Sequence, residues 1–428
     1  MSNSEQRLVR AIGLKEIVAL TINGIIGAGI FALPADAAKM LGPMSPIAFA
    51  IAGLFTTVIV LCFAELGGRY DRTGGAYLYA HEAFGGVLAF LIGWLYFLAR
   101  LTSIGALSNA LAGFVGFFIP LTGFARSLFL ICLLMTLGLI NYRGIRLSTR
   151  LINFLTIAKL LPLLLFIIAG LFFVNWQHFK DVSFPAVRPL TQTLLITMFA
   201  FTGFEVIAVP GAEIINTRKT VPLGLLLGTG TTILIYVLIQ TVAVGTLPGL
   251  ASSQTPLASA AKTFLGSKGG VVLAIGAICS TIGTLMSLLL VAPRILFAMS
   301  LNHDMPESFS QIHSQYRTPH VAILFCILLT AVVALSSGFT RLATLSAIAR
   351  MMTYIGSASA LLLLRKKAPE PEKFQAPGGW LIPVLTILLC LFLLTATTRS
   401  HWIAGGIAIA VGLLLYAWGR LRVAPHSS

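Results

Sequence analysis

The sequence predicts an all-α membrane protein with twelve transmembrane helices. Its 428 residues are 57% hydrophobic and only 10% charged, and their mean hydropathy is +0.95. A soluble domain carries about 25% charged residues, because its surface faces water. So few charges cannot coat a globule of this length, and we expect the outer surface to face lipid. A single domain over residues 1–428 is expected.

Twelve apolar runs are long enough to cross the hydrocarbon core, which takes about 20 residues. They cover residues 15–34, 44–67, 84–118, 125–143, 149–174, 190–215, 222–247, 268–300, 320–337, 341–365, 380–397 and 401–420. The third and eighth runs are long enough to tilt or to extend beyond the bilayer. Residues 1–16 are polar and basic without a cleavage site, so the first run is expected to remain as a span.

The loop charges predict the orientation of the spans. With the N-terminus inside, 18 of the 29 Lys and Arg residues lie on the cytoplasmic side and 8 on the other. Positive charge accumulates in cytoplasmic loops, so both termini, including residues 1–14, are expected in the cytoplasm. The protein is then a multi-pass protein of the cell membrane, which is the inner membrane in a bacterium. This topology explains the net charge of +16 without a nucleic-acid partner.

Residues that carry catalytic or metal chemistry do not form a recognisable set. The five cysteines lie singly in apolar runs, and the seven histidines show no HExxH spacing. Neither a Walker-type phosphate loop nor GxSxG is present. We therefore expect no enzyme activity, metal or cofactor, and any transport must use an ion gradient, exchange or the substrate's own gradient.

The first span carries Gly24, Gly27 and Gly29, followed by Pro34, where the helix is expected to end. Each glycine weakens a helix by about 0.8–1.0 kcal/mol relative to alanine. A break here would free the amides of Gly27, Ala28 and Gly29 for a carboxylate. The carbonyl groups that would suit a cation or an ammonium group are those of Asn23, Gly24 and Ile25. Alternatively, the small residues let helices pack closely, and composition favours neither interpretation.

The sixth span contains a second candidate break at Gly203, next to Glu205. An acid in an apolar run predicts a functional site, although a structural hydrogen bond is the alternative. The two breaks lie five spans apart, as two inverted repeats of five helices would place them. The repeats would cover residues 15–174 and 190–365, with two further helices in 380–420.

Four more charged residues lie within apolar runs. Lys159 is too deep to reach water easily, so it is either a proton carrier or a fixed ammonium that ties the fifth span to the carbonyls of the first. Glu65 lies near the inner end of the second span, where a gate or loop contact is expected. Arg100 and Arg350 are also deep, and their pattern assigns them no role.

Several segments together resemble the amino acid–polyamine–organocation transporters, in particular the bacterial amino-acid permeases. These segments are Gly24–Pro34 (GIIGAGIFALP), Ala64–Tyr79 (AELGGRYDRTGGAYLY), Asn153–Pro162 (NFLTIAKLLP), Ala200–Glu205 (AFTGFE) and Pro293–Pro319. The resemblance extends over nearly the whole chain. It implies a LeuT-like fold of five-plus-five inverted repeats with helices one and six broken, two extra helices, and transport by alternating access.

The resemblance also implies how an amino-acid substrate binds. Its carboxylate would meet the amides of Gly27, Ala28 and Gly29. Its amine would meet carbonyls at the two breaks, near Ile25, Phe199, Thr202 and Gly203. Phe199 falls where the family places an aromatic gate, and Lys159 matches the lysine that replaces a sodium ion, which implies sodium independence. Lys159 and Glu205 are the expected ion-coupling residues, with protons as a possible partner beside the substrate and the lipid bilayer.

The side chain of the substrate is less well specified. The expected side-chain pocket consists of Ser103, Ser280, Thr284 and Tyr354, without an aromatic clamp on the eighth helix. A small or medium neutral amino acid is therefore favoured. Glu205 leaves a cationic amino acid or polyamine exchanger as the alternative. A non-transporting sensor is disfavoured, because no appended signalling domain is visible, and a passive channel is disfavoured by the two breaks. Exchange and symport remain equally open.

One loop departs from the family pattern. Asn302-His303-Asp304 stands where relatives usually have Asp-Gly after helix eight. The departure is expected to affect only this loop.

Overall fold

The computed structural model describes residues 13–70, 75–143, 159–180, 185–205, 215, 217–367 and 374–423. All regular secondary structure in these ranges is helical. Seven helical stretches among them are long and apolar enough to cross a membrane, from Gly29–Arg69 to Arg399–Ala417. Three shorter apolar helices, Lys159–Leu171, His320–Ser336 and Leu381–Leu394, accompany them. These features indicate a multi-pass helical membrane protein, and the count of twelve spans stays a prediction.

The described helices coincide with the predicted apolar runs. The first half contains α1 (Leu14–Ile25), α2 (Gly29–Leu41), α3 (Ser45–Arg69), α4 (Gly75–Ala83), α5 (Gly86–Val115), α6 (Gly123–Arg143) and the helix Lys159–Leu171. The second half contains α8 (Val187–Ala200), α9 (Thr217–Thr246), α10 (Pro256–Leu301), α11 (His320–Ser336), α12 (Phe339–Lys367), α13 (Leu381–Leu394) and α14 (Arg399–Val423). Only the short α4 has no counterpart among the predicted runs.

The long helix α10 contains a change of direction. Gly266 has φ +67° and ψ −168°, which breaks the helical backbone near its start. The eighth predicted run begins just after this point, so the excess length of α10 is a separate short segment and not a longer span.

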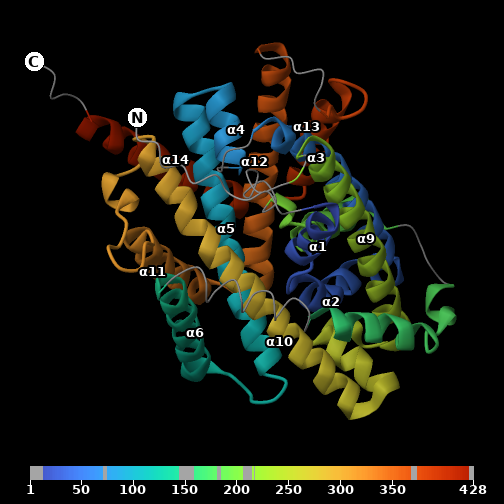
Figure 1. Cartoon of the computed structure of the whole chain (residues 1–428). Helices are drawn as coiled ribbons and strands as arrows, with labels where there is room; N and C mark the ends of the chain where they lie inside the picture. Colours follow the sequence, from blue (N-terminus) through green and yellow to red (C-terminus); the bar gives the residue numbers. More distant parts are fainter. Residues whose placement is uncertain are drawn as a thin grey trace, which may run out of the picture.

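Two helices occupy the centre of the molecule. α5 and α12 pack along each other, α10 crosses α5, and α1 and α3 both pack against α9 (Figure 1). α5 is buried around most of its circumference, including the charged Arg100. α14 lies at the periphery, where much of its surface is exposed (Figure 1).

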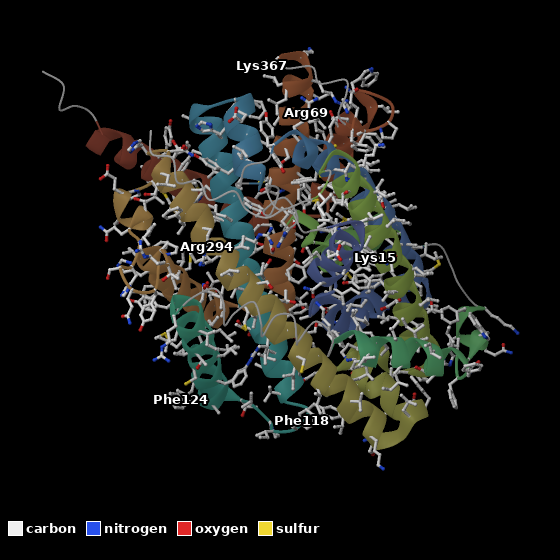
Figure 2. The ribbon with its side chains drawn as sticks, in the orientation of Figure 1. Lys15, Arg69, Phe118, Phe124, Arg294 and Lys367 are labelled. Atoms are coloured by element: carbon white, nitrogen blue, oxygen red, sulfur yellow. The ribbon has the colours of Figure 1, made fainter. Side chains whose placement is uncertain are left out.

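Large apolar side chains cover the outside of the bundle. Leu54, Phe124 and Leu328 are 62%, 81% and 66% exposed. A soluble monomer rarely exposes apolar surface on this scale, so these side chains are expected to face lipid. Figure 2 shows Arg69 and Lys367, both predicted to be cytoplasmic, at one end of the molecule, and Phe124 towards the other.

The backbone of the first span is interrupted between α1 and α2. α1 ends at Ile25, Ile26 leaves the helical region with ψ 89°, and α2 begins at Gly29. A Cβ atom on Gly24 would lie 2.8 Å from the carbonyl oxygen of Gly203. Both interpretations of these glycines, a helix break and close packing between helices, therefore hold in the structure.

The prediction that the first span ends at Pro34 is wrong. Pro34 lies inside α2, which continues to Leu41. Pro34 is the sixth residue of α2, and because proline has no backbone N–H, one hydrogen bond of the helix is lost there. Four of the residues that follow, Ala35, Ala37, Ala38 and Leu41, are buried, and the carbonyl of Pro34 accepts a hydrogen bond from the side chain of Gln240 at 3.2 Å. Packing of the apolar face thus outweighs the lost bond.

The sixth predicted span is also interrupted. α8 ends at Ala200, and residues 201–203 form a turn. Gly203 has φ +117°, a backbone conformation that favours glycine. The predicted remainder of this span, after Glu205, lies largely outside the described residues.

Candidate functional site

The break in the first span presents a row of buried amides. Within the described residues, the N–H groups of Ala28, Gly29 and Ile30 have no hydrogen-bond acceptor, and all three residues are buried. The amide of Gly27 lies at the hydroxyl of Tyr236. Buried N–H groups without a partner are rare in proteins. The first turn of α2 is therefore suited to an anionic acceptor such as a carboxylate.

Neighbouring helices form the walls of this row. A Cβ atom on Gly27 would lie 3.2 Å from the hydroxyl oxygen of Thr284, and one on Gly29 would lie 3.0 Å from the Cα of Ala200. Thr284 belongs to α10 and Ala200 to the end of α8. A larger residue at either position would make an unusually tight contact, so the glycines keep the backbone close to these neighbours.

Lysine and tyrosine side chains already bind the carbonyls of the first break. Lys159 is 3% exposed, and its Nζ donates to the carbonyls of Asn23 at 2.8 Å and Ile26 at 2.5 Å. The hydroxyl of Tyr236 lies 3.0 Å from the carbonyl of Ile25 and 3.1 Å from that of Ala200. The expected contact between Lys159 and the first span is present, whereas Tyr236 was missed by the sequence reasoning.

The break in the sixth span folds back on itself. The carbonyl of Phe199 accepts from the hydroxyl of Thr202 at 2.8 Å. The amide of Gly203 donates to Oε2 of Glu205 at 2.9 Å. The ring of Phe199, the expected gate, meets the ring of Phe339 on α12 with centroids 6.0 Å apart.

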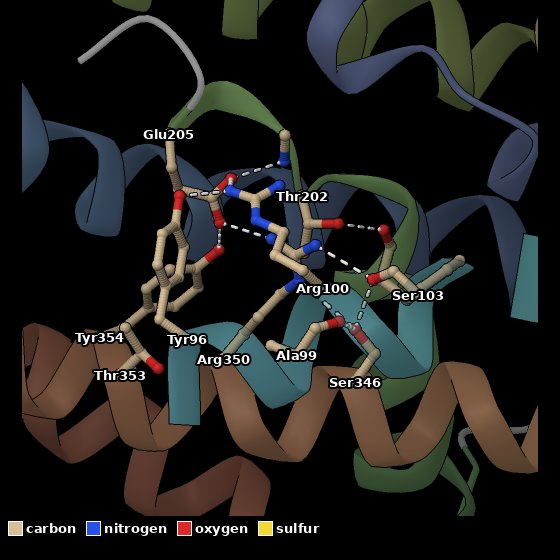
Figure 3. A network of polar contacts seen from close by, with 12 residues as sticks. Tyr96, Ala99, Arg100, Ser103, Thr202, Glu205, Ser346, Arg350, Thr353 and Tyr354 are labelled. Atoms are coloured by element: carbon tan, nitrogen blue, oxygen red, sulfur yellow. Dashed lines mark hydrogen bonds and ion pairs between the residues drawn. The ribbon is translucent and has the colours of Figure 1, made fainter. Parts of the chain in front are cut away.

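Glu205 is the centre of a buried polar network (Figure 3). Its Oε1 accepts from Nη1 of Arg350 at 2.8 Å and from the hydroxyl of Tyr354. Its Oε2 lies 3.4 Å from Nη2 of Arg100, which also donates to the hydroxyl of Tyr96. The network joins α5, α12 and the turn after α8.

Two serines extend the network between α5 and α12. Nη2 of Arg350 donates to Ser103 at 3.1 Å, and the hydroxyl groups of Ser103 and Ser346 are 2.7 Å apart. Ser346 also donates to the carbonyl of Ala99 at 2.9 Å. These contacts hold the two central helices together beside the second break.

The four residues of the expected side-chain pocket fall into two groups. Ser103 and Tyr354 belong to the network around Glu205. Thr284 instead faces Gly27, and the hydroxyl of Ser280, one turn earlier on α10, is buried and has no hydrogen-bond partner among the described residues. The roles of Arg100 and Arg350 could not be predicted, although their place in apolar runs marked them as unusual.

A second carboxylate holds the end of the molecule that is predicted to be cytoplasmic. Glu65 pairs with Arg69 at 3.1 Å and with Arg365 of α12, and it accepts from the amide of Ala376 at 2.7 Å. Glu65 thus makes the loop contact expected from its position.

The loop after α10 packs onto α4. Tyr77 donates to Asp304 at 2.8 Å, and Asn302 donates to Tyr77 at 3.1 Å. His303 has φ +59°, a conformation that glycine adopts more easily, which fits the glycine expected near this position.

Known proteins resemble this chain over almost its full length. A family model described as amino acid permease matches residues 12–416. The branched-chain amino acid permease BcaP of Bacillus subtilis (strain 168) is 28% identical over 97% of this chain and 94% of its own length. From the same organism, a methylthioribose transporter is 30% identical, with 97% and 94% covered. The serine/threonine exchanger SteT is 30% identical, with 96% and 97% covered.

Proposed function

The chain belongs to the amino acid permease family, and on this premise we propose that it is a sodium-independent secondary transporter of amino acids that works by alternating access. The proposal includes twelve spans in two inverted repeats of five plus two, with both termini in the cytoplasm. It is a membrane transporter and not an enzyme. The observation that carries the substrate class is the row of buried amides at Ala28, Gly29 and Ile30, for which the described part of the chain supplies no acceptor.

These amides are proposed to bind the substrate's α-carboxylate. Three consecutive donors at a helix N-terminus, away from water, favour a negative group by hydrogen bonding and through the helix dipole. The row begins one residue later than the sequence suggested, because Tyr236 lies at the amide of Gly27. The hydroxyl of Ser280, which has no partner in the described ranges, is a further candidate donor.

The substrate's α-amine is proposed to bind at the turn after α8. The carbonyl of Ile25 accepts from the hydroxyl of Tyr236 and has a second lone pair, whereas the carbonyl of Phe199 already accepts from both the hydroxyl and the amide of Thr202. The carbonyl of Thr202 has no partner among the described residues. An ammonium group there would lie between the two breaks.

Sodium independence is supported by the position of Lys159. Its ammonium group bonds two carbonyls that would otherwise be available to a metal cation. A fixed positive charge at this point removes the need for a sodium ion. Whether Lys159 also carries a proton decides between pH-driven uptake and exchange, and both remain part of the proposal.

The cationic alternative loses its main support. The expectation of a cationic amino acid or polyamine depended on Glu205 as the partner for the substrate's basic side chain. Two guanidinium groups already contact this carboxylate, at 2.8 Å from Arg350 and 3.4 Å from Arg100. A lysine, arginine or polyamine would have to displace one of them. The same contacts weaken the expectation that Glu205 is an ion-coupling residue.

The full-length protein, purified and reconstituted in liposomes, tests the proposal. Uptake of a panel of labelled amino acids would be measured with and without a pH gradient, in sodium and in choline buffer. We expect at least one amino acid to be transported at equal rates in both buffers. If the folded protein moves none of the panel, the proposed substrate class is wrong; if uptake requires sodium, the role of Lys159 is wrong.

A further inference from the structure

The polar network around Glu205 contains more positive than negative charge. One carboxylate faces the guanidinium groups of Arg100 and Arg350, and all three side chains are at most 2% exposed. The other named members of the network, two tyrosines and two serines, are neutral. Among the described residues the network therefore carries a net charge of +1 within the bundle, where an uncompensated charge is costly and marks a functional site.

The surplus belongs to Arg100 and not to Arg350. Arg350 has a close ion pair with Glu205 at 2.8 Å and a hydrogen bond to Ser103 at 3.1 Å. Arg100 reaches Glu205 only at 3.4 Å, and otherwise contacts the hydroxyl and the ring of Tyr96. Its Nε and Nη1 atoms are buried and have no hydrogen-bond partner in the part of the chain that the structure describes. Three N–H donors of a charged group are thus unused.

Arg100 lies next to the proposed binding site for the substrate's backbone. The carboxylate that it contacts also accepts from the amide of Gly203, and Gly203 packs against Gly24 of the first break. Figure 3 shows the side chains of Arg100 and Arg350 reaching Glu205 between the turn at Thr202 and the two tyrosines. A substrate held at the two breaks would therefore have its side chain within the surroundings of this network.

We propose that Arg100 binds an anionic group on the substrate's side chain, so that the transported class is the dicarboxylic amino acids. This inference rests on the proposed function and replaces the neutral side chain that the sequence favoured. A second carboxylate would neutralise the surplus charge and accept hydrogen bonds from the unused donors of Arg100. A neutral side chain of the same shape would leave that charge buried and unpaired.

The test compares isosteric pairs in proteoliposomes made with the full-length protein. L-Glutamate and L-glutamine, and L-aspartate and L-asparagine, differ in charge but hardly in size. We expect at least one acid to be taken up at least tenfold faster than its amide. In Arg100→Gln, the ratio of acid to amide uptake should fall at least tenfold, and Arg100→Lys, which keeps the charge, should retain part of it.

Arg126→Gln is the matched control. Arg126 bonds Asn109 at 2.7 Å near the start of α6, away from the network, so its loss removes the same charge but should leave the ratio unchanged. Transport of glutamine, serine or leucine without transport of either acid would overturn the inference and leave the proposed function intact. Failure of every amino acid would instead overturn the proposed function. If Arg100→Gln does not fold, the isosteric pairs in the unmodified protein still decide.

Discussion

Replacement of Gly203 by alanine tests whether the two backbone breaks pack together as described. At φ +117°, an alanine is strained by about 1–3 kcal/mol. In addition, its Cβ would overlap the carbonyl oxygen of Gly24. The strain alone corresponds to a population change of about 5- to 150-fold. With the overlap added, we expect the initial uptake rate to fall at least about tenfold at equal protein incorporation.

Alanine substitutions at two further glycines serve as comparisons for the loss of uptake expected in Gly203→Ala. In Gly24→Ala, alanine gains about 0.8–1.0 kcal/mol of helix propensity. Its Cβ would lie 2.8 Å from the carbonyl oxygen of Gly203, and overpacking of this kind costs about 1–3 kcal/mol. A smaller loss than at Gly203 is expected. Gly230 lies in α9 with nothing within 4 Å of an added Cβ, so Gly230→Ala should be neutral or slightly stabilising.

The assay is counterflow uptake in proteoliposomes, with folding checked by size-exclusion chromatography and by thermal denaturation of the purified variants. The order of loss should be Gly203→Ala, then Gly24→Ala, then Gly230→Ala. Uptake by Gly203→Ala within twofold of the unmodified protein would refute the close contact of the two breaks and, with it, the proposed site for the substrate's amine.

Three other substitutions probe separate parts of the molecule. Lys159→Ala should abolish pH-driven uptake in a folded protein, and unchanged pH dependence would mean that the lysine is only a tether. Glu205→Gln leaves two buried guanidinium groups without a carboxylate and should destabilise the protein by about 3–5 kcal/mol, measured as a lower denaturation temperature. The double variant Glu205→Gln with Arg100→Gln should recover part of this loss. A Glu205→Gln protein as stable as the unmodified one would contradict the ion pairs. Tyr77→Phe should cost about 1.5–3 kcal/mol, because the hydroxyl donates to Asp304. Burial, together with Asp304, raises the pKa of Tyr77 above its ordinary value. The contribution of this hydrogen bond to stability should therefore be constant up to about pH 10 and be lost only as the pH rises further. Loss of this stability at neutral pH would contradict the hydrogen bond.

The sequence predicted the helical class, the apolar runs and both breaks, because these depend on local composition. Gly24, Gly27 and Gly29 weaken a helix wherever it lies. The end of the first span was mispredicted, since the contacts of α2 beyond Pro34 outweigh the local effect of the proline. Local sequence composition thus mispredicts the end of a helix where packing against distant segments determines it.

The partners of buried charges are even harder to predict from local sequence. Lys159 was expected to reach the first span because its depth calls for a partner, and a family pattern supported the same contact. Arg100 and Arg350 had no such pattern, and each is more than a hundred residues from Glu205 along the chain. Composition shows that a buried arginine needs a partner, but not which carboxylate supplies it. For this reason the charge surplus, which revises the expected substrate, could be recognised only from the structure.

Two of the buried carboxylates, Glu205 and Glu65, place a common constraint on α12. Glu205 binds Arg350 and Glu65 binds Arg365, so this one helix supplies an arginine to both. At 1.5 Å per residue, the two arginines lie about 22 Å apart along α12, one at the central network and the other at the end predicted to be cytoplasmic. Arg365 ties α12 to α3, while Arg350 ties it to α5 and the turn after α8. A tilt of α12 relative to these neighbours must separate at least one buried ion pair, and the cost is lowest if an arriving group replaces the partner that is lost. If an anionic substrate paired with Arg100, Glu205 would have to pair only with Arg350. The pair between Glu205 and Arg350 could then persist while the ion pair between Glu65 and Arg365 separates.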